Sequence, residues 1–220
     1  MIPLREKKAA QTRLALLDAL LDRIEDAPLH TIPVKALCAE VPCSEPTFFN
    51  HFKGKDHLIV FYIQLWSLEM SWLAEHDLAQ LSALARIETL LTRTMGKISQ
   101  RPGLMGEILA YQARVPIITP PRPLSRAEKV LAFPDYADVE SLEGGGLQTV
   151  IPPLLEAAVA TGELPPDADL SSLFFAICSI FFGSPVVGRQ VDLGLLEPML
   201  RRQLHWLWAG IRQTSTSEAS

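Results

Sequence analysis

The side chains best suited to recognise another molecule gather in one short stretch, residues 45–51, EPTFFNH. The amide of Asn50 can donate and accept hydrogen bonds together, which is how asparagine reads adenine in the major groove of DNA. Glu45 can accept a hydrogen bond from the amino group of cytosine, and Thr47 or His51 can reach a base edge or a phosphate. The same residues can also form a plain solvated helix face. The stretch therefore predicts a surface that reads DNA, with an inert surface as the alternative.

Two short helices are predicted around this stretch, with a tight turn between them. Val34–Glu40 has apolar residues at helical spacing. Pro42 ends this helix, because proline lacks a backbone N–H and disfavours helix in the residue before it. Ser44 can cap the second helix, and Pro46 is tolerated in its first turn. We predict a helix-turn-helix unit, whose second helix can enter a major groove.

Residues 44–58, SEPTFFNHFKGKDHL, resemble the signature of the TetR/AcrR family of transcription regulators. The positions that match this signature are Ser44, Thr47, Phe52, Lys55 and Leu58. Phe49 departs from it by standing where the family has tyrosine, and Pro42 and Pro46 stand where the family mostly has glycine. Upstream, residues 13–24 resemble the family's first helix. The motif match covers about a quarter of the chain.

The resemblance implies an all-α fold, with a three-helix DNA-binding head over residues 1–55 and a helical ligand-binding and dimerisation body over residues 56–213. Taken with the side-chain chemistry, it predicts DNA contacts from Lys35, Ser44, Glu45, Thr47, Phe49, Asn50, His51 and Lys55. Lys55 is expected to meet a phosphate. Phe49, which lacks a phenol oxygen, is expected to pack on a sugar or a thymine methyl group. Phe48 and Phe52 are expected in the core.

The charge of the chain suits nucleic acid only weakly. Its 20 basic and 25 acidic residues give a net charge of −5 and a pI of about 5.6, whereas DNA-binding domains are often strongly basic. Residues 1–57 hold eight of each sign, so the acidic excess lies in the remainder. Basic side chains border the reading helix, near the N-terminus and at Lys35, Lys53 and Lys55. We expect modest non-specific affinity with a shallow salt dependence.

Other chemistry finds little support in the sequence. There is no nucleophile elbow, zinc-protease motif, phosphate loop or dinucleotide-binding turn. Cys38, Cys43 and Cys178 fit neither a disulfide framework nor a zinc pattern, so we expect reduced core cysteines. No cofactor and no metal site is predicted. A small helical enzyme remains a minor alternative.

Helical periodicity continues through the rest of the chain. Proline and glycine positions divide it into helices at about 5–26, 55–75, 82–99, 102–112, 124–133, 147–160, 170–182 and 195–212. Thr31 is the expected cap of the helix that begins at Val34. Residues 115–123, VPIITPPRP, are expected to be an extended loop, and residues 214–220 a disordered tail. The helix at 170–182 is apolar all round, which predicts burial on every side.

The predicted body has two tasks. A single head offers little contact area, so a homodimer is expected, held through the helices near 147–160 and 195–212. A small, largely apolar effector is expected in a pocket lined by Trp66, Met95, Met105, Tyr111 and Arg114. The alternatives are that the apolar side chains are ordinary core and that the arginine lies on the surface.

These patterns favour a cytoplasmic homodimeric transcription regulator, a repressor that leaves its palindromic operator when the effector binds. No apolar run reaches the ~18 residues of a membrane span, and the N-terminus has no signal-peptide pattern. The alternative is a helical ligand-binding or interaction protein whose head does not read DNA.

Overall fold

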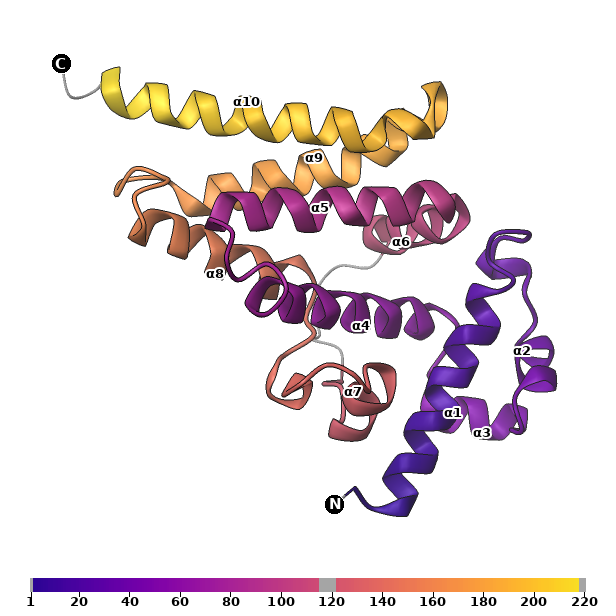
Figure 1. Ribbon diagram of the computed structural model, residues 1–220. Helices are drawn as coiled ribbons and strands as arrows, with labels where there is room; N and C mark the ends of the chain where they lie inside the picture. The colour runs from indigo at the N-terminus through magenta and orange to yellow at the C-terminus, as the bar shows by residue number, and fades with distance from the viewer. Residues whose placement is uncertain (1, 115–121, 218–220) are drawn as a thin grey trace. The chain divides into compact units, whose positions relative to one another are not determined.

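A computed structural model describes residues 2–114 and 122–217, with side chains as far as residue 212. Throughout these ranges the chain is helical and contains no strand, as predicted (Figure 1). The α-helices are α1 Leu4–Leu21, α2 Val34–Glu40, α3 Glu45–His51, α4 Asp56–Glu75, α5 Ala83–Gln100, α6 Pro102–Arg114, α7 Arg126–Ala132, α8 Leu147–Ala160, α9 Leu170–Val191 and α10 Leu196–Ser217. Short 3-10 helices are η1 Leu29–Thr31, η2 Val139–Ser141 and η3 Leu193–Leu195. Most of the predicted proline-rich loop at 115–123 lies outside the described residues.

The chain forms two compact units that are each built from separate stretches of sequence. Unit 1 comprises Met1–Trp72 and Arg101–Gly146, and unit 2 comprises Leu73–Gln100 and Leu147–Ser220. The predicted boundary at residues 55 and 56 follows the end of the three-helix head. In the structure that head shares its unit with most of α4, with α6 and with the segment that holds α7.

The core of the head forms where α1, α2, α3 and the start of α4 meet. Leu16 and Leu37 are fully buried, as are Phe48 and Leu58. Phe52 is 2 % exposed and joins the same cluster, so the core positions predicted for the two phenylalanines are confirmed. The apolar stripe of α1 therefore holds the two short helices in place.

Four predicted helix limits differ from the structure. The helix predicted at 170–182 continues to Val191. Thr31 does not cap α2, because its hydroxyl donates to the carbonyl of Pro28 and no side chain caps that helix. The first helix ends at Leu21 and continues as turns to residue 26. At the other end, α10 continues to Ser217, so residues 214–217 of the predicted disordered tail are helical.

Residues 122–146 contain the helix predicted at 124–133 and a link that follows it, and the structure shows them anchored along α4. We call them the α7 segment. The side chain of Gln64 donates to the carbonyl of Arg122 at 2.9 Å, and the hydroxyl of Ser67 accepts from the N–H of Gly146 at 2.9 Å. Trp72 stacks on Tyr136, with 4.0 Å between ring centroids, and donates to the Ala137 carbonyl. The link is thus an ordered part of unit 1.

Unit 2 is a set of packed helices in which α5 lies against α8 and α10, and α9 lies against α8 and α10 (Figure 1). The apolar face of α8 is consumed by this packing, and its buried residues include Val150, Ile151 and Leu155. The carboxylate of Glu163 accepts hydrogen bonds from the N–H groups of Ala83 and Leu84, which caps the start of α5.

The prediction that α9 is buried on every side is wrong. Leu173, Ile177 and Phe181 face the interior, but Phe175 is 75 % and Val187 53 % exposed on the opposite face. Among the described residues, α9 is the helix long and apolar enough by composition to cross a membrane. A helix that packs against a second protein chain has the same apolar composition.

Candidate nucleic-acid interface

Helix α3 is short, and local hydrogen bonds define its start. Ser44 precedes it, and its hydroxyl oxygen accepts from the N–H of Thr47 at 3.3 Å, as predicted for a capping residue. The two hydroxyl oxygens also lie 2.9 Å apart. Ser44 and Thr47 are therefore partnered within the turn, which limits their free hydrogen-bonding capacity toward another molecule.

The outer face of α3 presents the side chains that were predicted to read bases. Glu45, Phe49 and Asn50 are all exposed, with Phe49 at 54 %. The Phe49 ring meets Phe48 edge to face at 5.2 Å between centroids. A core residue thereby holds an exposed aromatic ring in a defined position. Lys35 is also exposed, on α2.

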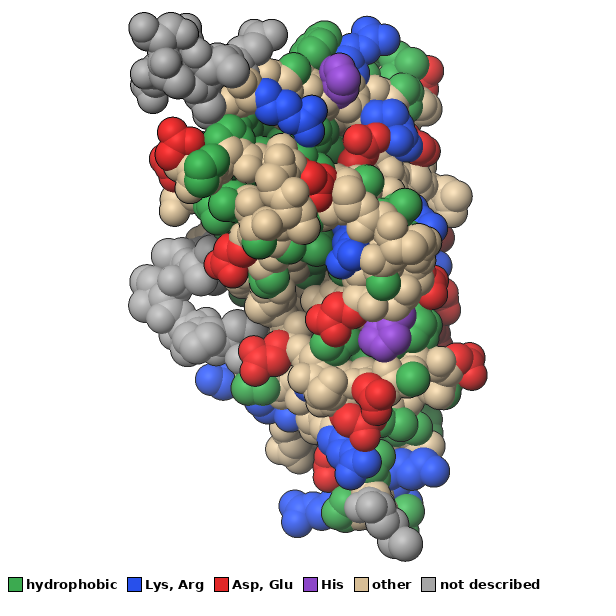
Figure 2. Space-filling view, turned by 60° about the vertical axis from the view of Figure 1, so that its left-hand side comes forward, with side chains coloured by type: hydrophobic (Ala, Val, Ile, Leu, Met, Phe, Trp, Pro, Cys, Tyr) green, Lys and Arg blue, Asp and Glu red, His purple; other side chains and the backbone are tan. Residues whose placement is uncertain are grey.

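Several exposed positive side chains lie on the first helix of the head. Arg5, Lys7 and Lys8 are exposed on the first turns of α1. In Figure 2, Lys and Arg side chains gather at the lower end of the molecule, where α1 and α7 lie in Figure 1. Such side chains can contact phosphates without reading sequence.

Lys55 has a different environment from the one predicted. Its ammonium group lies 2.6 Å from the carbonyl oxygens of Leu29 and Ile32 and 3.1 Å from that of His30. An ammonium group has three donors, and all three are taken. The predicted phosphate contact would require these bonds to break. We correct the assignment: Lys55 ties the start of α4 to the turn that precedes α2.

The Lys55→Met variant is expected to lower the free energy of unfolding by about 2 kcal/mol, because three carbonyls lose a charged donor. Urea denaturation followed by circular dichroism would measure this loss. Lys53→Met is the matched control, since Lys53 is exposed and lies two residues away. Equal stability of the two variants would contradict the positioning role.

His51, the last residue of α3, is half-buried beside two guanidinium groups. Burial lowers the pKa of His51 from its ordinary value of 6.5, and the charges of Arg13 and Arg122 lower it further, against an opposing effect of Glu128. At neutral pH the ring is therefore an uncharged donor and acceptor, which suits a base edge better than a phosphate.

This shift predicts an acid-sensitive contribution to stability. The folded head binds the His51 proton less readily than the unfolded chain does, so the contribution is fully present above pH 6.5 and is lost as the pH falls below that value. Between pH 8 and pH 5, the unfolding temperature of His51→Gln is expected to fall less than that of the wild type. Parallel curves for the two proteins would refute it.

Glu128 is a buried charged group of unit 1 with several partners, and it was not predicted from the sequence. Its side chain is 1 % exposed, and one carboxylate oxygen lies 2.5 Å from Arg13 Nε and 2.5 Å from Arg122 Nη2. The other accepts from the N–H of Ser125 at 2.6 Å, which completes a capping box at the start of α7. The sequence signal is the Ser-x-x-Glu spacing of that box.

The residues predicted to bind an effector are distributed over both units. Trp66 on α4 and Tyr111 on α6 are half-buried, and Met105 is buried on α6, all in unit 1. Met95 is fully buried on α5 in unit 2. Arg114 is exposed at the end of α6, where its Nη2 lies 3.9 Å from Asp56 Oδ1. Arg114 therefore lies on the surface, which is the alternative given above to a place in the effector pocket.

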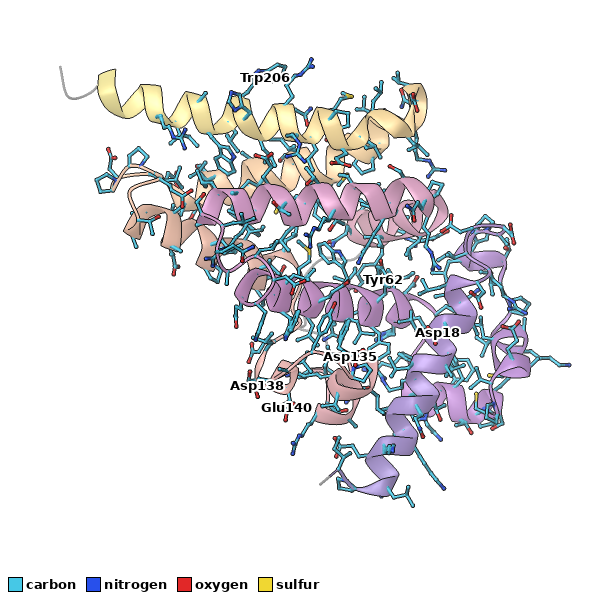
Figure 3. All side chains as sticks on the ribbon, in the orientation of Figure 1. Asp18, Tyr62, Asp135, Asp138, Glu140 and Trp206 are labelled. Carbon is cyan, nitrogen blue, oxygen red and sulfur yellow. The ribbon has the colours of Figure 1, made fainter. Side chains whose placement is uncertain are left out.

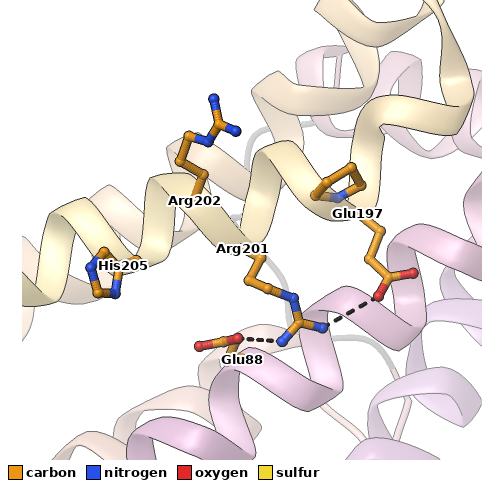
Figure 4. A pocket seen from close by; sticks show the side chains of 6 residues that line it. Glu88, Glu197, Arg201, Arg202 and His205 are labelled. Carbon is orange, nitrogen blue, oxygen red and sulfur yellow. Dashed lines mark hydrogen bonds and ion pairs between the residues drawn. The ribbon is translucent and has the colours of Figure 1, made fainter.

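A groove of about 460 Å³ lies between α5 and α10 of unit 2 (Figure 4). Arg201 bridges two acidic residues there, with its guanidinium 2.5 Å from Glu88 and 3.3 Å from Glu197. Arg202 and His205 complete the polar lining. This groove is charged and does not suit the apolar effector predicted from the sequence.

Exposed apolar side chains concentrate on α9, η3 and α10. Seven of the nine large apolar side chains that are exposed in the described chain lie there. We call this set the α9–α10 face: Phe175, Val186, Val187, Val191, Leu195, Met199 and Trp206. Trp206 projects outward from α10 in Figure 3 and is 63 % exposed. A patch of this kind marks an interaction surface.

Comparisons with known proteins identify the fold. No family model matches the sequence, and no curated protein matches it. A TetR transcriptional regulator from Rhodococcus sp. RHA1 superposes with a TM-score of 0.58 and 17 % identity, over 93 % of this chain and 98 % of that one. The regulator FadR from Bacillus subtilis, in complex with stearoyl-CoA, superposes with a TM-score of 0.61 and 11 % sequence identity, over 87 % of this chain and 97 % of that one. The TetR regulator TylP from Streptomyces fradiae superposes with a TM-score of 0.58 and 16 % sequence identity, over 92 % of this chain and 87 % of that one. The chain thus has the fold of the TetR-family transcriptional regulators.

Proposed function

We propose that this chain is a cytoplasmic, homodimeric transcription regulator that reads DNA with α3 and releases it when a small molecule binds. The observation that carries the proposal is the outer face of α3. Glu45, Phe49 and Asn50 are exposed together on a helix whose inner face is anchored by the fully buried Phe48. Side chains of these types can accept from cytosine, contact a thymine methyl group and read adenine.

The second copy is proposed to dock on the α9–α10 face. Sequence reasoning favoured the helices near 147–160 and 195–212, but the apolar residues of α8 are used inside unit 2. The exposed apolar residues of α9 take its place. Ser179 and Gly183 also lie on the exposed side of α9, and small residues of this kind allow close helix packing. Two such faces related by a two-fold axis would form an isologous four-helix contact.

The effector is proposed to be a small, largely apolar molecule bound near α4 and α6. Support comes from the half-buried Trp66 and Tyr111 and the buried Met105 on those helices. The FadR structure contains an acyl-CoA, so a ligand with a long apolar chain is a reasonable first class to test. The release of DNA on binding makes the protein a repressor in this proposal.

Selection from a library of random DNA duplexes tests the proposal directly. Enrichment of a palindrome with half-sites about one helical turn apart, or a multiple of it, is the expected result for a dimeric reader. Acyl-chain ligands can then be screened for release of that duplex. If no sequence is enriched even at low salt, the proposed reading of DNA is wrong, and the chain is better described as a ligand-binding or interaction protein.

The Asn50→Ala variant is expected to bind the selected operator more weakly by about 1–3 kcal/mol, because a bidentate contact to adenine is lost. Fluorescence anisotropy with a labelled duplex measures the change. Gln100→Ala is the control, since it removes an exposed amide at the end of α5, outside the head. Wild-type affinity in the Asn50 variant would refute the site assignment.

A further inference from the structure

The buried carboxylate of Glu128 binds two arginines that come from different parts of unit 1. Arg13 lies on α1 of the head, and Arg122 lies at the start of the α7 segment. Among the residues that the structure describes, the N–H of Arg13 Nε has no aligned hydrogen-bond acceptor, so its contact with Glu128 is an ion pair. A charge that is 1 % exposed needs such partners, because an unpaired buried carboxylate is very costly.

Arg13 extends this contact to the end of the reading helix. Its Nη1 donates to the carbonyl oxygen of His51 at 2.7 Å. The last carbonyls of a helix lack partners within the helix, and a cation near them is also favoured by the helix dipole. The guanidinium of Arg13 further lies 4.2 Å from the centroid of the Phe52 ring and 4.4 Å from that of Phe61. Arg13 is therefore a cap for α3 that is held over the aromatic core of the head.

The position of Arg13 as a cap for α3 depends on the carboxylate of Glu128. Burial lowers the pKa of Arg13 to about 10 and the charge of Arg122 lowers it as well, whereas Glu128 raises it. Without the carboxylate, two neighbouring guanidinium groups would repel each other in a desolvated site. The favourable response is for Arg13 to turn toward solvent, which releases the His51 carbonyl.

The α7 segment, which carries Glu128, is held in place by contacts with both α1 and α4. On one side α7 packs along α1, where the N–H of Ala127 lies 3.4 Å from a carboxylate oxygen of Glu6. On the other side Gln64, Ser67 and Trp72 hold the segment along α4. Gly144 lies so close to α4 that an added Cβ would come 2.3 Å from the Gln64 carbonyl oxygen. The position of Glu128 is thus set by α4 as well as by α1.

We propose that Glu128 is a positioning residue for DNA reading, which acts through Arg13 on the C-terminal end of α3 without touching DNA. This proposal rests on the proposed function for its consequence in DNA binding. The structural part of the proposal, that Glu128 holds α3 in position, does not depend on DNA.

The test compares Glu128→Gln with Glu140→Gln in the whole 220-residue chain. Both variants remove one negative charge from the α7 segment. Glu140 pairs at 3.0 Å with the exposed Arg126 and makes no contact with Arg13 among the described residues. We expect Glu128→Gln to lower operator affinity at least about tenfold, because it breaks a buried ion pair, and Glu140→Gln to leave it near wild type. Loss of a negative charge alone would strengthen attraction to phosphates, so a weakened complex separates positioning from a general charge effect.

Two further measurements separate positioning from unfolding and from failure of the proposed function. If α3 is misaligned in Glu128→Gln, the affinity of this variant for an unrelated duplex should fall much less than its affinity for the operator. If the head unfolds, both affinities should fall equally. Hydrogen exchange of the peptide that spans residues 45–58, measured without DNA, should become faster in Glu128→Gln only. If the wild type selects no operator, the proposed function fails, and the exchange result still decides the proposal. Unchanged exchange in Glu128→Gln, or equal affinities for the two variants, would overturn it.

Discussion

The Val187→Glu variant is expected to be a monomer that binds the operator at least roughly 100-fold more weakly than the wild type, because a second copy would have to bury an unpaired carboxylate. Val187 lies near the C-terminal end of α9, four residues before Val191, and is 53 % exposed. It is one of the seven exposed apolar side chains of the α9–α10 face, which come from α9, η3 and α10. A monomer presents only one head, so it loses the joint binding of two half-sites.

Sedimentation velocity and fluorescence anisotropy on the same preparation measure the two parts of this prediction. Ala160→Glu is the matched control. It places the same charge on an exposed position of α8, one of the two helices predicted from the sequence to form the dimer contact. A dimeric Val187→Glu protein, or a monomeric Ala160→Glu protein, would contradict the proposed interface. Binding of the wild type to lipid vesicles would instead indicate that the apolar face of α9 meets a membrane.

The features that could be predicted from the sequence are those determined by neighbours in the chain. The limits of α2 follow from apolar spacing and the proline that ends it, and they agree with the structure. The Ser44 cap and the two buried phenylalanines follow from residue type and position within one turn. The exposure of Glu45 and Asn50 on α3 follows from the same periodicity, because these polar residues lie opposite the core, whereas the exposure of the apolar Phe49 does not.

The features that could not be predicted depend on partners far away in the sequence. Lys55 is a cationic residue at the start of a helix, and only the fold shows that three carbonyls surround its ammonium group. Glu128 pairs with a residue more than a hundred positions earlier, and the spacing of its capping box reveals only its local role. The exposed face of α9 was missed for a related reason: an apolar composition does not show which part is covered within one chain and which part awaits a partner.

A close approach between α6 and the end of α1 leads to the second large prediction. The N–H groups of Gly103 and Leu104 donate to the carboxylate of Glu25 at 2.8 and 3.0 Å, so a residue of the head caps the start of α6. The N–H of Leu29 in the head also donates to Glu107 of α6 at 3.0 Å. An added Cβ at Gly103 would come 2.4 Å from the carbonyl oxygen of Ile24, which is backbone and cannot rotate away.

Gly103→Ala is therefore expected to lower the free energy of unfolding by about 3 kcal/mol, from overpacking and from loss of the Glu25 cap. Urea denaturation measures it. Gly96→Ala is the control with the opposite sign, because an added Cβ there meets nothing within 4 Å and alanine is favoured over glycine inside a helix by roughly 0.5–1 kcal/mol. Destabilisation of both variants by the same amount would mean that the contact with Ile24 has no special cost.

The same variant also tests how a ligand could influence the head. Met105 and Tyr111 of the proposed effector site lie on α6. Hydrogen bonds connect this helix to Glu25, in the turns before η1, and to Leu29, the first residue of η1. If effector binding displaces α6, the displacement reaches the head through these contacts. A folded Gly103→Ala protein should then bind the operator but release it less completely at saturating ligand than the wild type does. Full release by both proteins would indicate that coupling runs instead through α4 and the α7 segment, where Gln64, Ser67 and Trp72 provide the alternative route.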